Sequence, residues 1–117
     1  MRRSLSRTER LLSKADFARV FDNPDFRSGC TGAKLVARHN GMETSRFAVT
    51  LVRKYGNAVK RNSARRVLKE IYRNTKQNLP CGIDLIVVLY PGDFSYHERE
   101  RQFMELIRRA DFVQTDN

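Results

Sequence analysis

The sequence predicts an α+β fold in a single domain over residues 1–117, with elements in the order α-β-β(-β)-α-β-α. Three observations support this prediction. A chain of 117 residues suits one compact domain. The apolar fraction of 40% suffices for a modest core, while 31% charged residues and the absence of tryptophan indicate a polar surface. Segments with helical and with strand-like patterns alternate, and no repeat or linker separates them.

Residues 1–12 are expected to form an irregular basic arm, because they carry four arginines and show little apolar periodicity. Ser13 is a candidate cap for the helix that follows. In that helix Phe17, Val20 and Phe21 recur at helical spacing, and it should end before Asn23-Pro24. The two phenylalanines fit either a core or an aromatic binding edge, so both interpretations stay open.

Residues 27–39 have an extended pattern, which predicts a first long strand with a break near Gly29 and Gly32. Lys34 and Arg38 lie on this segment, and Asn40-Gly41 marks the turn after it. Residues 46–53 are rich in side chains that suit a pleated sheet and predict a second strand. Residues 83–90 predict a further strand, buried in the sheet.

Two more helices complete the prediction. Asn57 should cap a helix that runs to about Thr75, and residues 79–82, Leu-Pro-Cys-Gly, should interrupt it. Ser95 should cap the last helix. The apolar stripe of that helix comprises Phe103, Leu106, Ile107 and Ala110.

The formal net charge of +10 indicates a polyanionic partner. Self-repulsion at this charge destabilises the compact state, and neutralising phosphates with Lys or Arg releases counterions. Nucleic acid is therefore the expected partner, although a charge that serves only solubility stays open. No window approaches the roughly 20 apolar residues of a spanning helix, and no secretory signal is evident. We expect a cytoplasmic protein with no membrane partner.

The chain shows no arrangement of residues typical of a metal or catalytic site. Cys30 and Cys81 are far apart and form no Cys-x-x-Cys pair, and His39 and His97 have no zinc-site spacing. A protein nuclease needs paired acid and base groups or clustered carboxylates, whereas the acidic residues here are scattered. We therefore expect no protein metal site and no catalytic residues.

The predicted helix after Asn57 carries the strongest functional signal. Nine Lys or Arg residues and the single acid Glu70 lie between Arg53 and Lys76, whereas a solvated helix face usually mixes both signs. Projected on an ideal helix, one polar set falls within roughly a 140° arc. It comprises Arg61, Arg65, Lys76, Lys69, Asn62, Arg73 and Arg66. The opposite, apolar face comprises Ala64, Val67, Leu68 and Ile71.

This pattern predicts phosphate binding rather than an idle surface, because arginine suits bidentate phosphate contacts. Gly56, just before the helix, permits close backbone approach, so a phosphate or a phosphate-bound magnesium near the first helical turn is one interpretation. A simple turn is the other. A DNA-binding helix is less favoured, because no helix-turn-helix partner precedes it.

The run from Arg53 to Glu70 reads RKYGNAVKRNSARRVLKE and resembles the signature of the bacterial ribonuclease P protein subunit. The resemblance covers nearly the whole chain, including the element order and the phenylalanines at 17 and 21. Lys69 stands where Arg is usual and Arg65 where Lys is usual. Gly32 and Ala33 stand where the first strand often offers an aromatic residue, which puts part of the family's cleft in doubt.

The resemblance implies a protein that assists a catalytic RNA. That RNA uses bound Mg2+ to remove the 5′ leader from precursor transfer RNA, and the protein alone is expected to be inactive. It also implies a left-handed strand-helix-strand crossover, RNA-bound magnesium and no obligate protein partner. The residues expected to bind the catalytic RNA are Lys60, Arg61, Asn62, Arg65, Arg66, Lys69 and Arg73. The residues expected in the leader cleft are Phe17, Phe21, Lys34, Arg38, Arg53 and Lys54. A ribosomal or other structural RNA-binding protein is the alternative.

Overall fold

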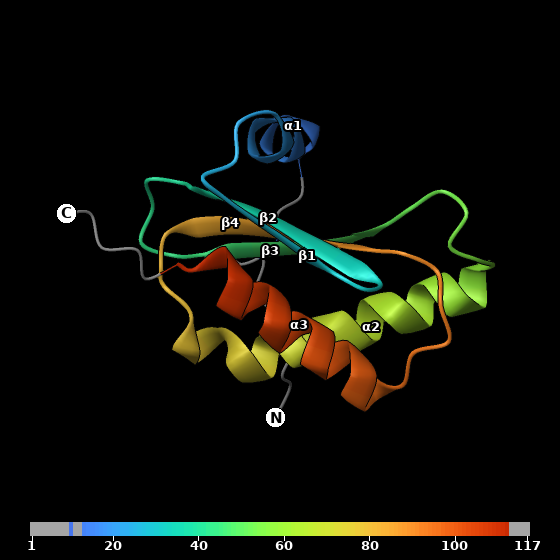
Figure 1. Ribbon diagram of the computed structural model, residues 1–117. Helices are drawn as coiled ribbons and strands as arrows, with labels where there is room; N and C mark the ends of the chain where they lie inside the picture. The colour runs from blue at the N-terminus through green and yellow to red at the C-terminus, as the bar shows by residue number, and fades with distance from the viewer. Residues whose placement is uncertain (1–9, 11–12, 113–117) are drawn as a thin grey trace, which may run out of the picture.

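The computed structural model describes Arg10 and residues 13–112, and arranges them in three layers (Figure 1). A four-stranded sheet forms the middle layer, with α1 on one face and α2 and α3 on the other. The elements are α1 (Lys14–Asp22), β1 (Phe26–Cys30), β2 (Ala33–His39), β3 (Arg46–Leu51), α2 (Ala58–Thr75), the 3-10 turn η2 (Lys76–Asn78), β4 (Ile83–Leu89) and α3 (Tyr96–Ala110). The α+β class and the predicted element order are confirmed.

The strand order in the sheet is β1-β2-β4-β3. The pairs β1–β2 and β2–β4 are antiparallel, and β3–β4 is parallel with α2 as its crossover. The left-handed sense of this crossover stays a prediction. The predicted break near Gly32 in the strand over residues 27–39 is confirmed, but it is a full reversal: the chain turns back at Thr31-Gly32 and makes two strands in a hairpin. Gly32 has a φ of +87°, a conformation that glycine adopts without strain.

All three predicted helix caps are confirmed. The side chains of Ser13 and Asn57 each accept a hydrogen bond of 3.0 Å from the amide three residues on. Ser95 and Glu98 form a reciprocal capping box at the start of α3. The predicted bounds of α2 are confirmed. The helix ends at Thr75, and the 3-10 turn η2 follows it before Pro80. β3 ends at Leu51, two residues earlier than predicted.

The larger core fills the space between the sheet and the helices α2 and α3. Phe47 stacks on Tyr72 with ring centroids 4.1 Å apart, and Phe103 meets Phe47 edge-on. Ala64, Leu68 and Ile71 of α2 are buried as their spacing predicts. One face of α2 is therefore fixed to the sheet, and the opposite face is left to the solvent.

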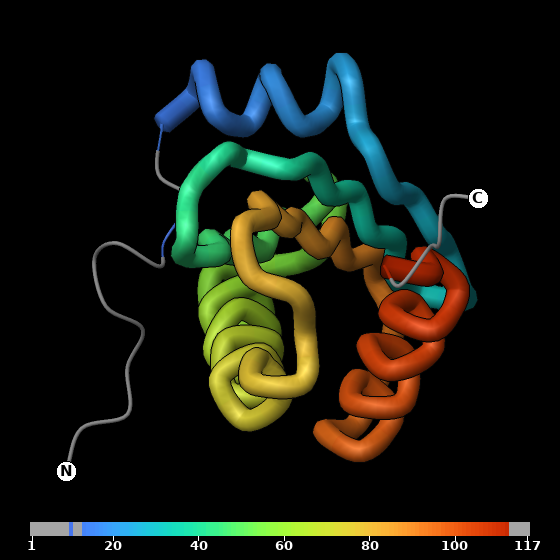
Figure 2. The backbone as a smooth tube through the Cα atoms, turned by 90° about the vertical axis from the view of Figure 1, so that its left-hand side faces the viewer, coloured from blue at the N-terminus to red at the C-terminus, as the bar shows by residue number. Residues whose placement is uncertain are grey.

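α1 lies over the other face of the sheet (Figure 2), and a smaller cluster fills the space between this helix and the strands. Val20 of α1 packs there with Val36, Ala48, Ile86 and Val88. Within the described residues, no helix is both long and apolar enough to cross a membrane. The predicted basic arm falls on residues 1–12, which lie outside the described residues apart from Arg10, and Arg10 makes an isolated bridge with Phe47.

Candidate nucleic-acid interface

The solvent face of α2 is strongly basic, and its cations differ in how free they are. Lys60, Arg66 and Lys69 are exposed, as is Asn62. Arg61, Arg65 and Arg73 are half-buried. The basic face of α2 hereafter means Lys60, Arg61, Asn62, Arg65, Arg66, Lys69 and Arg73.

Two of these arginines also have structural partners. The Nη1 atom of Arg61 donates to the carbonyl oxygens of Val52 and Arg53, at 3.2 and 3.3 Å. Arg61 therefore holds the end of β3 against the first turns of α2. Arg73 forms an ion pair with Glu70, one helical turn before it. The other basic side chains of this face have more freedom to meet phosphates.

α1 covers only part of its face of the sheet. Arg46 Nη1 lies 3.3 Å from Asp16 Oδ2, and Arg38 donates to the carbonyl oxygen of Asn23 at 2.7 Å. Arg38 and Arg46 both pair in register with Asp84, so α1 crosses the sheet at the Asp84 end of β4. The opposite end of this face stays accessible. We call it the open sheet face, defined by Lys34, Thr50, Val52 and Tyr90.

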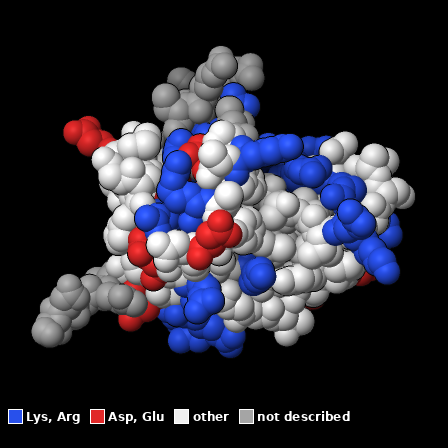
Figure 3. Space-filling view, turned by 90° about the horizontal axis from the view of Figure 1, so that it is seen from above, with Lys and Arg blue, Asp and Glu red and all other residues white. Residues whose placement is uncertain are grey.

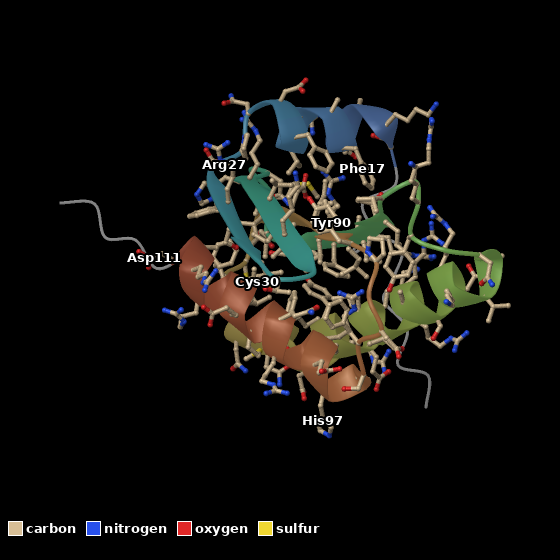
Figure 4. All side chains as sticks on the ribbon, turned by 45° about the vertical axis from the view of Figure 1, so that its right-hand side comes forward. Phe17, Arg27, Cys30, Tyr90, His97 and Asp111 are labelled. Atoms are coloured by element: carbon tan, nitrogen blue, oxygen red, sulfur yellow. The ribbon has the colours of Figure 1, made fainter. Side chains whose placement is uncertain are left out.

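Phe17 and Phe21 of α1 border the open sheet face, with ring centroids 6.5 Å apart and an angle of 23° between the ring planes. Phe17 is half-buried and packs against the smaller cluster, whereas Phe21 is 39% exposed. Figure 4 shows Phe17 pointing from α1 toward the sheet, on the side where Tyr90 lies. Phe17 thus serves the core in part, and Phe21 has surface free for a ligand.

Basic residues border the same face. Lys34 is exposed on β2, and Arg53 and Lys54 are exposed just after β3. Seen from the α1 side, Lys and Arg surround a paler central area (Figure 3). Arg38 differs from the others because its guanidinium holds the end of α1 through the Asn23 carbonyl. Arg38 therefore supports the end of α1, and its contact with a ligand stays a prediction.

A buried ionic network fixes α1 on the sheet. Asp84 is 2% exposed and accepts two hydrogen bonds from Arg46, from Nε at 2.8 Å and from Nη2 at 2.7 Å. The same arginine reaches Asp16 of α1, which also pairs with Arg19 at 2.9 Å. Burial acts to raise the pKa of Asp16, but hydrogen bonds from Arg19 and Ser13 and the charge of Arg46 outweigh it and lower the pKa below its usual value.

Sequence reasoning missed Tyr90, Arg46 and Asp84. Strand alternation carried a signal for all three, since Asp84, Ile86, Val88 and Tyr90 must share one face of β4. The apolar run predicts a uniformly buried strand and gives no sign that Tyr90, directly after β4, is partly exposed. The Arg46–Asp84 pair joins residues 38 positions apart, so only the strand pairing brings it together.

The described residues contain no group of three or more His, Cys, Asp or Glu that could hold a metal ion. Cys30 is half-buried and Cys81 is exposed, and both are free thiols. The chemistry available at the interface is therefore that of cations, hydrogen-bond donors and aromatic rings. Such a surface suits the binding of a phosphate backbone and unpaired bases.

Comparison with known proteins decides the family. The model of the family described as Ribonuclease P matches residues 5–111. The chain belongs to the ribonuclease P protein family. The ribonuclease P protein component of Thermotoga sp. strain RQ2 is 34% identical over 88 residues, covering 75% of this chain and 74% of that protein. The component from Pseudomonas aeruginosa strain PAO1 is 31% identical over 110 residues, covering 92% and 81%.

Solved ribonuclease P proteins share the fold. The Thermotoga maritima protein has a TM-score of 0.74 and 28% identity, covering 86% of this chain and 96% of that chain. A Staphylococcus aureus protein solved at 2.0 Å has a TM-score of 0.81, covering 91% and 98%, and its 20% identity supports the fold alone. The family assignment disfavours the alternative of a ribosomal RNA-binding protein.

Proposed function

We propose that this protein binds the catalytic RNA of ribonuclease P through the basic face of α2. The observation that carries the proposal is that a helix with one buried apolar face presents almost only positive charge on the other. Exposed Lys60, Arg66 and Lys69 meet phosphates directly, while Arg61 also holds the helix in place. RNA docking neutralises this charge and releases counterions.

The open sheet face, together with Phe21, Arg53 and Lys54, binds the 5′ leader of precursor transfer RNA. Single-stranded RNA is held by aromatic rings that stack on bases and by cations that follow the backbone. Phe21 supplies an exposed ring, Tyr90 a second aromatic side chain, and Lys34 a cation on the same face. Arg61 joins the two surfaces, because it bonds the carbonyl of Arg53 from within the basic face of α2.

In this proposal the RNA carries out the cleavage. Magnesium is bound by the RNA and its phosphates, and the protein favours binding of leader and catalytic RNA together. The protein acts in the cytoplasm and needs no further protein subunit. The outcome is hydrolysis at the junction of leader and transfer RNA, which leaves a mature 5′ end.

Reconstitution tests the proposal. Precursor transfer RNA is incubated with a bacterial ribonuclease P RNA at low magnesium, with and without this protein. We expect site-specific cleavage only when the protein is present. Equal cleavage without the protein, or none at any magnesium concentration with it, would contradict the proposed role.

A matched control variant separates the effect of total charge from the effect of losing a contact at the basic face of α2. Arg101 is exposed on α3, away from both proposed surfaces. Arg101→Glu and Lys69→Glu change the net charge equally, so a simple effect of total charge predicts equal losses of cleavage. The proposal expects a loss only for Lys69→Glu.

A further inference from the structure

A cavity of about 670 Å³ lies between the first half of α2, the segment after β4 and the start of α3. Its volume falls within the roughly 300–1,000 Å³ typical of small-molecule sites. The residues that define it for the argument are Tyr55, Val59, Lys60, Ser63, Phe94 and Arg99. Of these, only Lys60 belongs to the surfaces assigned above.

Arg99 brings a buried positive charge to this cavity. It is 3% exposed, and its hydrogen-bond acceptors are neutral. Nη1 donates to the Gly32 carbonyl at 3.0 Å and to Gln102 Oε1 at 2.8 Å, while Nη2 donates to Tyr55 Oη at 2.8 Å and to the Tyr90 carbonyl at 3.3 Å. Among the described residues no carboxylate pairs with it. A buried cation without a counter-charge gives the cavity a positive potential, which favours an anion there.

A fixed aromatic wall stands beside this charge. The Arg99 Cζ atom lies 4.5 Å from the centre of the Phe94 ring and 5.9 Å from that of Tyr55. The Phe94 ring fits against Gly32 and Gly92, where an added Cβ would come within 2.8 and 2.2 Å of ring atoms. The absence of a side chain at both glycines therefore leaves room for the ring in this position.

The mouth of the cavity combines apolar and cationic groups. Val59, in the first turn of α2, is 77% exposed. Lys60 and Ser63 are exposed next to it. Asp93 is the acid among the lining residues, and it is exposed, so the two cations Lys60 and Arg99 outnumber it. An anion with a flat apolar part matches this lining better than a bare anion does.

We propose that this cavity binds one unstacked nucleotide of a single-stranded RNA segment, with the base against Phe94 and Val59 and the phosphate attracted by Lys60 and Arg99. RNA recognition commonly uses bases that leave the stack and pack on aromatic side chains. The site lies on the α2–α3 side of the sheet, whereas the open sheet face lies on the α1 side. This inference rests on the proposed function at one point, which is that the nucleotide belongs to RNA.

Amide chemical shifts of the isolated full-length protein test the site. The probes are adenosine 5′-monophosphate, adenosine and inorganic phosphate, titrated separately at constant ionic strength. We expect saturable shifts around Val59, Ser63 and Phe94, with adenosine 5′-monophosphate binding more tightly than either of the other probes. Because no catalytic RNA is present, failure here leaves the reconstitution experiment unaffected, and the reverse also holds.

Val59→Glu adds a negative charge at the mouth without touching the core, and should weaken binding of adenosine 5′-monophosphate roughly fivefold or more. Met104→Glu is the matched control, because Met104 is also an exposed apolar residue, 47% exposed on α3, and does not line the cavity. Equal affinity in the two variants would overturn the site. Equal binding of inorganic phosphate and the nucleotide would show an anion site only, and shifts confined to Phe17 and Tyr90 would move the nucleotide to the open sheet face.

Discussion

Replacing Phe21 with Ala tests whether the rim of α1 contacts the leader. Phe21 is 39% exposed, so the truncation removes less buried surface than the loss of a fully buried phenylalanine would. Its stability cost should therefore fall below the roughly 3–5 kcal/mol of a fully buried phenylalanine. Stacking on a base is worth about 1–3 kcal/mol. The variant holoenzyme should therefore bind precursor transfer RNA about fivefold to a hundredfold more weakly, at roughly 1.4 kcal/mol per tenfold change.

The assay compares dissociation constants for precursor and mature transfer RNA, because only the precursor carries a leader. Tyr96→Ala is the matched control, since Tyr96 has the same 39% exposure on α3. We expect it to change neither constant. Phe17→Ala should combine a leader defect with a lower melting temperature, because Phe17 also packs on the smaller cluster. Equal weakening of precursor and mature RNA by Phe21→Ala would refute the reasoning.

Four further predictions concern salt dependence, the basic face of α2, cleavage by the protein alone and pH dependence. With six of the nine cations from 53 to 76 in contact with phosphates, RNA affinity should fall about a thousandfold between 50 and 200 mM salt. A flat salt dependence would exclude the basic face of α2 as the RNA contact surface. Lys69→Glu should lower the slope of log affinity against log salt by at least about 1, measured beside Arg101→Glu, which should leave it unchanged. The purified protein alone should not cleave precursor transfer RNA, and site-specific cleavage in an RNA-free preparation would overturn this. The lowered pKa of Asp16 stabilises the fold above the unfolded-state value of about 3.9, and this contribution is lost as the pH falls through the folded-state pKa. Melting curves of the wild type and Arg19→Met, which removes the ion-pair partner of Asp16, should therefore converge at low pH.

Local signals predicted the fold well. Ser13, Asn57 and Ser95 each cap a helix through a side-chain bond to an amide three residues on, a geometry that depends only on neighbouring residues. The hairpin of β1 and β2 was missed as such, because strand-like residues continue on both sides of Gly32. Only the antiparallel register of β1 with β2 shows which residues fold back. Strand order and the parallel pairing of β3 with β4 likewise depend on contacts distant in sequence.

The site was predictable where one element carries it. The basic face of α2 follows from the helical period. Its opposite side is buried as expected, except that Val67 is only partly buried and Tyr72 adds an aromatic ring to the core. Arg38 stays a predicted leader contact, and the structure adds a second role, because one of its donors binds the Asn23 carbonyl. Sequence spacing places a cation on a face, and only tertiary contacts show whether its donors are already used.

For Arg99, too, only tertiary contacts show which groups its donors bind, although this arginine lies on a buried stripe and not on an exposed face. It occupies the stripe of α3 that continues with Phe103, Leu106 and Ala110, so its spacing indicated a buried position for a charged side chain. A buried guanidinium without an acid is costly unless its donors are satisfied. Here the carbonyls of Gly32 and Tyr90 satisfy it, and both come from the ends of strands that also border the open sheet face. Arg99 therefore ties the wall of the α2–α3 cavity to the backbone of Gly32 and Tyr90, at the edge of that face.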